Sequence, residues 1–508
     1  MGSQQPPAMD ETGTNRPSAP RKSLVGPILS LLCCPACGGT LTEGDGNRLD
    51  CTGCDARVAL VDGIADFVAG TAATALDDID YDAKYAINLQ ASLLLYDTIV
   101  TAAGPRWTGA FGDAIEIGCG TGGFSMAFLS RAAFDRVVLT DVSVKMLRLC
   151  HARLSRMESL LRAEALGLAT FSGVETGFAP GAFDTCYGTA VLHHITDVTL
   201  ALRRIHALLK PGGRAFFMEP ALPFHRALTG TAADILAALI REGGVSEDER
   251  SRIANWIAEV HCNVANTGDA VVLADREDKH QFIGAEVTAM AHAAGFAVAE
   301  ALPVGPDHDG TTTIGVYLSQ LGLSAETLER IRAAWPAAQA RHFAALPPNE
   351  QAPSYLFWLE KTAFTQRAPR PSRASAKTSP VAPRSVHLWL EIQAVRRGAA
   401  LVVTLTGWCV AKQPVRAIEL TCGTRTMRFP IWLPRPDVLA AVNADGSYPN
   451  LHALCSGISG EAPLDSDGSH APPILIAVVT VGEARLAVEI VTLVPGDPAH
   501  CIDVLLPA

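Results

Sequence analysis

The chain has 508 residues, which is too many for one hydrophobic core of ordinary size, so we expect about three domains. Its composition, 48% hydrophobic and 18% charged, is that of a globular protein, and no apolar run approaches the ~18 residues of a membrane-spanning helix. The net charge of -11 argues against broad, non-specific binding to nucleic acid.

The first 24 residues are polar and rich in proline, which predicts a disordered tail. They have no apolar signal-peptide core after their basic residues, so the predicted compartment is the cytoplasm. The thirteen cysteines agree with this compartment, because an odd number scattered through a long chain does not resemble a disulfide framework.

Two cysteine pairs follow in the stretch LLCCPACGGTLTEGDGNRLDCTGC. Cys34 and Cys37 form one C-x2-C pair and Cys51 and Cys54 form a second, each on a tight turn with glycine. Four thiolates spaced in this way suit a tetrahedral Zn²⁺ without an open position, which predicts a structural zinc ribbon. Cys33 is the spare cysteine, although an exchange with Cys34 stays open. The competing interpretation is four unrelated buried cysteines.

From about residue 80 the pattern alternates between helices and strands. YDAKYAINLQASLLLYDTIVTAAG predicts a helix, AIEI a strand, TGGFSMAFLSRAAF a helix, RVVLTDVS a strand and SVKMLRLCHARLSRME a helix. Strands joined through helices indicate right-handed crossovers and a parallel sheet. Ligands bind at the carboxyl ends of the strands in such sheets.

A glycine loop follows the first of these strands, in AIEIGCGTGGFS. Gly118, Gly120 and Gly123 satisfy G-x-G-x-x-G, and Asp141 ends the second strand, where an acidic residue holds ribose hydroxyls. These residues alone allow a dinucleotide site, or merely a tight turn between a strand and a helix.

The same loop also has the pattern Glu116-x-Gly118-x-Gly120-x-Gly122. A carboxylate at this place suits a cofactor with a cationic ammonium tail better than a pyrophosphate. Farther on, AFDTCYGTAVLHHITDVTLALRRIHALLKPGGRAFFMEP contains FD, LHH and LKPGG segments in that order. With these motifs the sequence resembles the class I S-adenosylmethionine-dependent methyltransferases over about residues 80 to 220. The resemblance resumes in EDKHQFIGAEVTAMAHAAGFAVAEALPV and SYLFWLEKT. The cysteine module resembles the zinc ribbons that precede some bacterial methyltransferases.

The resemblance implies roles for individual residues around S-adenosylmethionine. The implied cofactor-binding residues are Glu116, Gly118, Cys119, Gly120 and Gly122 in the loop, Asp141 at the ribose hydroxyls, Val142 on the adenine, and Thr189 and Ala190 facing the sulfonium. The sequence departs from the family after the third strand, where many relatives carry Asp and this chain has SGVET. Ser172 and Glu175 are candidates for that role.

Methyl transfer from a sulfonium is an in-line displacement, so positioning supplies much of the acceleration, and a hydroxyl acceptor also benefits from a base. His193, His194 and His280 are the candidate catalytic residues. LHH segments also recur in the family as scaffolding, and His280 lies in a charged cluster, DREDKHQF, that solvation alone could explain. Trp256, His261 and Asn263, in a helical insert, are candidates for lining the acceptor pocket, with ordinary core contacts as the alternative.

Beyond Lys361 a basic stretch rich in Pro, Ser and Ala predicts a linker. Six or seven short strands then indicate an antiparallel β-sandwich. Gly407-Trp408 and RPDVLAAV, with Arg435 to Val438, resemble a module appended to some bacterial glycosyltransferases and sugar-modifying enzymes. This resemblance implies a glycan or sugar-containing acceptor, and the alternative is a structural or dimerising sandwich.

The expected fold class is therefore an α/β class I methyltransferase fold, a Rossmann-like doubly wound sheet, with an N-terminal four-cysteine zinc ribbon and a C-terminal antiparallel β-sandwich. We expect a methyltransferase that uses S-adenosylmethionine and structural zinc and acts on a hydroxyl or amine of a small-molecule or saccharide acceptor. The competing functions are a zinc-ribbon rRNA methyltransferase and a binding or scaffold protein with a degenerate core. The sandwich could also serve a homo-oligomer or a protein partner. The expected domains are a tail at 1–24, the ribbon at 25–70, the methyltransferase domain at 78–365 with a helical lid insert at about 221–280, a linker at 366–384 and the sandwich at 385–508.

Overall fold

The computed structural model describes residues 24–68, 87–157, 165–362, 386–464, 474–492 and 499–506, apart from single residues and pairs inside these ranges. The predicted tail at 1–24, except its last residue, and the predicted linker at 366–384 lie outside the described residues. No helix in the described part of the chain combines the length and the hydropathy that a membrane crossing requires.

An eleven-stranded sheet runs through the N-terminal two thirds of the chain in the order β1-β2-β3-β4-β7-β6-β5-β8-β9-β11-β10. Its central strands pair in parallel, as predicted, whereas β11 pairs antiparallel with both β9 and β10. The strands of the methyltransferase part are β5 (Asp113–Ile117), β6 (Arg136–Asp141), β7 (Leu166–Thr170), β8 (Phe183–Thr189), β9 (Leu209–Pro220), β10 (Val298–Val304) and β11 (Ser354–Glu360). The predicted class I methyltransferase fold is confirmed.

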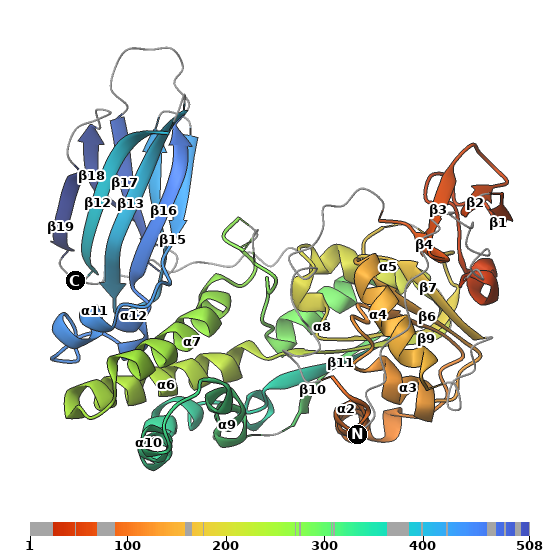
Figure 1. Ribbon diagram of the computed structural model, residues 1–508, viewed down its shortest axis with the longest axis horizontal. Coiled ribbons are helices and arrows are strands. Elements are labelled where there is room, and N and C mark those ends of the chain that lie inside the picture. Colours follow the sequence, from red (N-terminus) through yellow and green to blue (C-terminus); the bar gives the residue numbers. More distant parts are fainter. Residues whose placement is uncertain are drawn as a thin grey trace, which may run out of the picture.

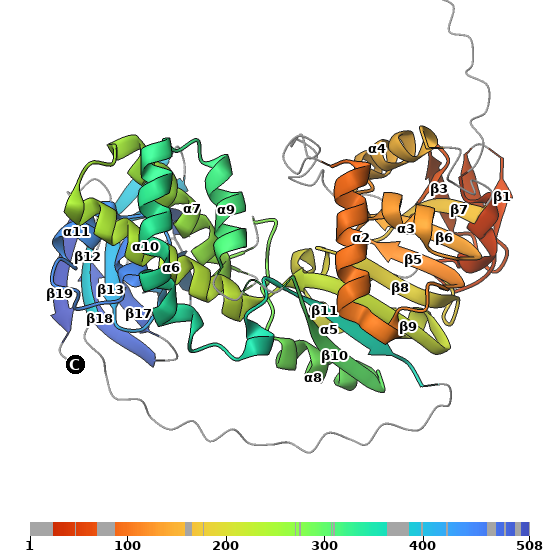
Figure 2. The ribbon, with the colours of Figure 1, turned by 90° about the horizontal axis from the view of Figure 1, so that it is seen from below.

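Helices cover both faces of this sheet (Figures 1 and 2). Successive residues of a strand point to opposite faces, so Ala114 packs into one core and Ile115 into the other. One face is covered by α2 (Leu89–Ala103), α3 (Ser125–Arg131) and α4 (Val144–Ser155), and the other by α5 (Val198–Leu208) and α8 (Gly284–Ala294). The short 3-10 turns are η1 (Gly26–Leu31), η3 (Gly104–Arg106), η5 (Leu192–His194) and η6 (Pro348–Glu350).

The cysteine-bearing module is the edge of the same sheet and not a detached unit. Its last strand pairs in parallel with β7, and Thr170 of β7 accepts hydrogen bonds from the backbone of Phe67 and Val68 at 2.8 and 3.0 Å. A Cβ atom on Gly167 would lie 2.4 Å from a carbon of Ile28, so the absent side chain lets η1 pack directly on β7. The four strands are β1 (Leu41–Gly44), β2 (Arg48–Cys51), β3 (Arg57–Val61) and β4 (Ile64–Asp66).

A layer of four long helices extends from the sheet. The predicted insert forms α6 (Leu222–Glu242) and α7 (Glu247–Asn266), and α9 (Thr311–Gln320) and α10 (Ala325–Phe343) join them from a second segment that the sequence did not indicate. Figure 2 shows the four helices beside the methyltransferase core and overlapping the strands of the C-terminal domain. The insert is therefore half of a larger helical layer.

The C-terminal domain is an antiparallel sandwich, as predicted, of two four-stranded sheets in the orders β16-β13-β12-β19 and β15-β14-β17-β18. Its helices α11 (Pro436–Ala441) and α12 (Asn450–Leu454) pack on α6 and α7, where Asn450 donates to Asp234 at 2.9 Å. Figure 1 shows the sandwich standing on this helical layer. The strands are β12 (Val386–Arg397), β13 (Ala400–Ala411), β14 (Val415–Cys422), β15 (Arg425–Pro430), β16 (Gly457–Leu464), β17 (Ile474–Val481), β18 (Ala484–Thr492) and β19 (His500–Leu506).

Candidate active site and metal centre

The glycine loop leaves β5 in a conformation that requires glycine. Gly118, Gly120 and Gly122 have φ angles of +68°, +52° and +92°, whereas Gly123 is not among the glycines with positive φ. A Cβ atom on Gly118 would also lie 2.3 Å from a methyl carbon of Val191. The backbone thus requires glycine at the three positions of the Glu-x-Gly-x-Gly-x-Gly pattern and not at the last position of G-x-G-x-x-G.

Asp141 fastens this loop from the neighbouring strand. The backbone N–H of Gly120 donates to Asp141 Oδ2 at 3.0 Å, and the N–H of Ser143 donates to Oδ1 at 2.9 Å. The carboxylate comes from the end of β6, which is paired in parallel with β5, so the two carboxyl ends lie at the same edge of the sheet. Asp141 also lines a hollow in front of the loop.

Two hollows meet at the loop. The first has a volume of about 690 Å³, and the second, toward the N-terminus of α2, has a volume of about 400 Å³. Both are lined by Gly118, Gly120, Ala190, His194 and Glu277. Of the other predicted cofactor residues, Asp141 and Val142 line the first hollow and Cys119 and Thr189 line the second. Two adjoining spaces are what a cofactor and an acceptor would need.

Several predicted residues lie outside both hollows. Glu116 and Gly122 lie behind the loop, and His280 donates from Nε2 to the carbonyl of Ile195 at 2.9 Å. The insert candidates Trp256 and His261 are buried in the helical layer, which matches the ordinary core contacts weighed against them, whereas Asn263 donates to Asp278 of the second hollow at 3.2 Å. Ser172 and Glu175 were the candidates for the position where many relatives carry Asp. Ser172 lines the first hollow, and its backbone N–H donates to Glu175 at 2.8 Å.

Glu116 is fully buried and holds the start of α3. Its carboxylate accepts hydrogen bonds from Ser125 at 2.7 Å and Tyr187 at 3.2 Å. Burial raises the pKa of Glu116 to about 7, and the two hydrogen bonds only partly oppose this shift. The side chain therefore keeps its proton to a higher pH than an exposed glutamate does.

The raised pKa of Glu116 predicts a pH-dependent stability. Because the folded pKa lies above the unfolded value of 4.5, its stabilising contribution is complete below pH 4.5 and is lost as the pH rises through about 7. At about 1.4 kcal/mol per pKa unit, the loss is about 3 kcal/mol. Glu116→Gln should therefore gain stability relative to the wild type between pH 5 and pH 8, measured by urea denaturation.

The control for this prediction is Glu259→Gln on the exposed face of α7, which should show no comparable gain in stability. An unchanged difference between Glu116→Gln and the wild type from pH 5 to pH 8 would contradict a raised pKa for the buried carboxyl.

A buried carboxylate–histidine cluster forms one wall of the second hollow. Glu219, which is 1% exposed, accepts hydrogen bonds from the backbone of Val191 and Leu192 at 3.0 and 2.7 Å and pairs with His193 Nδ1 at 2.7 Å. His193 Nε2 lies 3.4 Å from Asp278 Oδ1. Neither Glu219 nor Asp278 is among the residues predicted from the sequence, although acidic residues stand out at the end of the apolar strand FFMEP and in DREDKHQF.

The two neighbouring histidines have opposite protonation. Burial alone would lower the pKa of His193, but its hydrogen bonds to Asp278 and Glu219 and their charges raise it to about 10. Burial and the charge of His193 lower the pKa of His194 to about 4. His193 is therefore positively charged at neutral pH when nothing else binds, whereas His194 is neutral and faces both hollows.

The loop between α7 and α8, which carries Asp278, is held by the sandwich. Arg428 of β15 makes an ion pair with Asp269 of this loop, and the guanidinium of Arg276 lies 5.4 Å from the ring centre of Trp432. Arg276 itself lines the first hollow. The C-terminal domain thus contacts the wall of the site directly.

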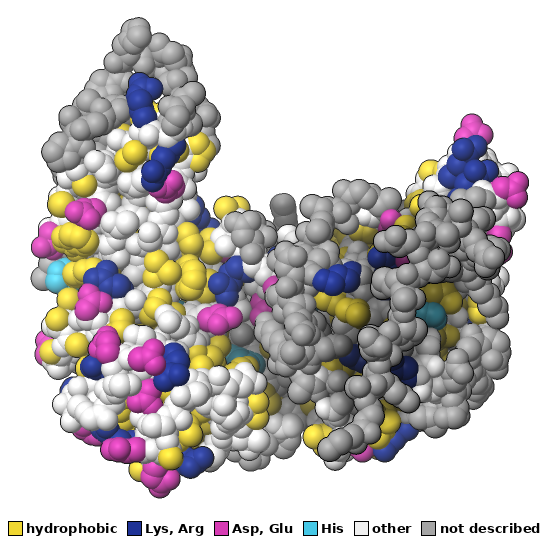
Figure 3. Space-filling view, in the orientation of Figure 1, with side chains coloured by type: hydrophobic (Ala, Val, Ile, Leu, Met, Phe, Trp, Pro, Cys, Tyr) yellow, Lys and Arg dark blue, Asp and Glu magenta, His cyan; other side chains and the backbone are white. Residues whose placement is uncertain are grey.

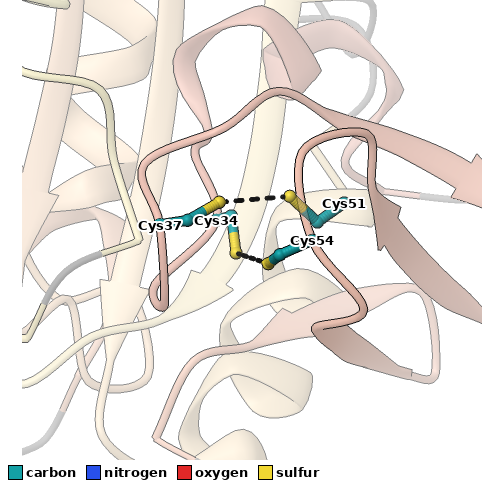
Figure 4. A group of neighbouring side chains, drawn as sticks. All are labelled: Cys34, Cys37, Cys51 and Cys54. Atoms are coloured by element: carbon teal, nitrogen blue, oxygen red, sulfur yellow. Dashed lines mark hydrogen bonds between the residues drawn. The ribbon is translucent and has the colours of Figure 1, made fainter.

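The four cysteines of the predicted ribbon form one cluster (Figure 4). The sulfur atoms of Cys34 and Cys54 are 3.7 Å apart, and those of Cys37 and Cys51 are 3.5 Å apart. Four thiolates about 2.3 Å from one tetrahedral ion would be about 3.8 Å apart. Cys33 is buried outside the cluster, so the geometry selects Cys34 and not Cys33.

Comparisons with known proteins agree with this fold. Residues 115–215 match the family described as a methyltransferase domain. Fumosorinone synthetase of Cordyceps fumosorosea is 30% identical over 159 residues, which are 29% of this chain and 4% of the synthetase. An uncharacterized chloroplastic methyltransferase of Arabidopsis thaliana is 32% identical over 102 residues, 20% of this chain and 29% of that protein. The chain thus spans less than a third of either relative.

Among solved structures, phosphoethanolamine N-methyltransferase 2 of Haemonchus contortus, in complex with S-adenosyl-L-methionine, is 15% identical with a TM-score of 0.31 and covers 58% of this chain and 61% of its own. A putative methyltransferase of Haloferax volcanii in complex with the Trm112 activator is 13% identical with a TM-score of 0.34, over 57% of this chain and 100% of its own. From the family match and the observed fold, this chain carries a class I methyltransferase domain.

Proposed function

We propose that this chain is an S-adenosylmethionine-dependent methyltransferase that methylates a hydroxyl or amine of a small-molecule or saccharide acceptor. The observation that carries the proposal is the loop of Gly118, Gly120 and Gly122 fastened by Asp141, with two hollows meeting at it. Bound S-adenosylmethionine supplies an electrophilic methyl group. The carboxylate of Asp141 would accept hydrogen bonds from the ribose hydroxyls of the cofactor. The loop backbone would approach the methionine part closely because its glycines have no Cβ atoms.

The second hollow supports a neutral or cationic acceptor. Its described lining includes Glu277 and Asp278 but no lysine or arginine. The two carboxylates outnumber the cationic His193, so a hydroxyl or amine that donates to them fits this wall better than a phosphate or carboxylate. Thr189, Ala190 and His194 would hold the acceptor near the end of the glycine loop.

The surface is consistent with a small acceptor. Figure 3 shows basic and acidic side chains interspersed over most of the described part of one face. An RNA substrate generally needs a concentrated positive surface.

We also propose Zn²⁺ as the ion of the cysteine cluster, in a structural role. Four thiolates at tetrahedral spacing leave no open position for a reacting group. This metal would stabilise the strands that extend the sheet beyond β7.

Labelled methyl donor offered with the protein to cell extracts tests the proposed function. Label should enter a small-molecule or glycan fraction that resists nuclease, and Asp141→Ala should transfer none. Label that disappears with the RNA after nuclease treatment would overturn the proposed acceptor class. The absence of any transfer by a chain that binds the methyl donor would overturn the enzyme proposal in favour of a binding protein.

A further inference from the structure

We propose that His193, His194 and Asp278 form a second metal site, which holds a divalent cation such as Mn²⁺ at the wall of the second hollow. One ligand atom from each residue lies within 4.8 Å of the others. The cluster joins η5 to the loop between α7 and α8, and all three residues line the second hollow.

Asp278 pairs with both histidines at distances that also suit ligands of one ion. Asp278 Oδ1 lies 3.4 Å from His193 Nε2 and 3.5 Å from His194 Nδ1. Ligands about 2.1 Å from a shared ion are about 3.0–3.5 Å apart. A charge-assisted hydrogen bond would instead bring nitrogen and oxygen to about 2.7–2.9 Å. A bound ion would displace the proton that His193 holds when nothing is bound, and the oxygen and the two ring nitrogens would then face the ion.

Hydrogen bonds from neighbouring residues orient the proposed ligands, as they do at many metal sites. Glu219 pairs with Nδ1 of His193 at 2.7 Å, which directs Nε2 toward Asp278. The carboxylate of Glu219 is itself fixed by three backbone N–H groups, those of Val191, Leu192 and His193. On the other side, Asn263 donates to Asp278 Oδ2 at 3.2 Å, which leaves Oδ1 toward the histidines.

The donor set indicates the class of metal. Two imidazoles with one carboxylate suit a first-row divalent ion with open positions. His194 Nδ1 donates a hydrogen bond to the carbonyl oxygen of Glu277 at 3.0 Å, and a metal would have to displace this proton. The oxygen ligands of this wall would then favour Mn²⁺. The cation would also neutralise the acidic wall formed by Asp278 and Glu277. This site differs from the cysteine cluster in its ligands and its place.

A second part of this inference rests on the proposed function. A metal at this site would narrow the acceptor to a hydroxyl compound, ideally a vicinal diol whose two oxygens can fill two open coordination positions of the ion. The bound hydroxyl would lose its proton to the Glu277 carboxylate and then to water. Its oxygen would form a bond to the methyl carbon while the carbon–sulfur bond breaks, giving a methyl ether and S-adenosylhomocysteine.

Electron paramagnetic resonance of Mn²⁺ titrated into the full zinc-loaded chain, without methyl donor, tests the site. We expect one saturable Mn²⁺ per chain and an affinity at least tenfold weaker in Asp278→Asn and in His194→Ala. Asp503→Asn, which removes the carboxylate 3.7 Å from His387 on the sandwich surface, should bind as the wild type does. Circular dichroism should show that all three variants are folded like the wild type.

The absence of saturable Mn²⁺ binding, or affinity unchanged by Asp278→Asn, would overturn the site. Added Mn²⁺ should also raise methyl transfer to a vicinal diol at least tenfold in the wild type and not in Asp278→Asn. A rate that Mn²⁺ leaves unchanged would overturn the catalytic part. Calorimetry with S-adenosylmethionine in the same samples separates the two proposals, because donor binding without Mn²⁺ binding leaves the proposed function intact.

Discussion

Asp141→Ala is expected to weaken binding of S-adenosylmethionine at least about 100-fold. The carboxylate accepts hydrogen bonds from the backbone of Gly120 and Ser143 and faces the first hollow, so alanine removes both the proposed ligand of the ribose and the two hydrogen bonds that hold the glycine loop. Hydrogen bonds to a charged group contribute about 1.5–3 kcal/mol each, and the loss of two corresponds to a factor of this size or more. Isothermal titration calorimetry measures the dissociation constant of S-adenosylmethionine in the variant and the wild type.

The matched control is Asp135→Ala, an exposed residue immediately before the start of β6. It should bind the methyl donor with wild-type affinity. If Asp141→Ala also binds the donor within threefold of the wild type, the ribose is held elsewhere and the assigned role of Asp141 is wrong.

Cys51→Ser is expected to reduce the zinc content from one per chain to near zero and to lower the first thermal unfolding transition by at least about 10 °C. Metal binding supplies about 10–16 kcal/mol in small zinc modules, far more than a module of this size gains from its own core. Because β4 pairs with β7, and Phe171 and Ser172 follow β7 into the first hollow, donor affinity should also fall, by less than tenfold. Elemental analysis and calorimetry provide the measurements.

Cys33→Ser is the control for the ribbon, because Cys33 is adjacent to the cluster in sequence but outside it in space. It should keep one zinc per chain. Loss of zinc from Cys33→Ser together with its retention in a Cys34→Ser variant would show that the two neighbouring cysteines exchange roles.

The glycine loop shows how much the sequence could predict. The spacing of Gly118, Gly120 and Gly122 and the position of Asp141 after the second strand depend on local chain geometry, which a pattern records directly. Parallel pairing of β5 and β6 then places these residues at one edge. Local patterns therefore placed the glycine loop and Asp141 at the edge of the core sheet, whereas most of the residues that line the first hollow, such as Met146, Leu200 and Arg276, were not predicted.

The parts that could not be predicted depend on contacts between distant segments. The pairing of Glu219 with His193 spans 26 residues, and the joining of the ribbon to β7 spans about a hundred. The sequence drew attention to His280, whereas the neighbouring Asp278 reaches the hollow, because the loop must be placed before its side chains can be oriented. The ion pair of Arg428 with Asp269 likewise depends on how the sandwich packs on the helical layer, which the sequence does not indicate.

The C-terminal sandwich contacts a loop that lines the proposed active site. Arg428 and Trp432 hold Asp269 and Arg276 of the loop between α7 and α8, and Arg276 lines the first hollow. The domain expected as a separate glycan-binding or dimerising module thus also supports the wall of the proposed active site.

The central claim is that the loop of Gly118, Gly120 and Gly122 with Asp141 binds a methyl donor. Isothermal titration calorimetry of the full chain with S-adenosylmethionine tests it most directly. We predict one binding site per chain with a micromolar dissociation constant in the wild type, and affinity at least about 100-fold weaker in Asp141→Ala. No detectable heat of binding by the folded, zinc-loaded wild-type chain would contradict the claim.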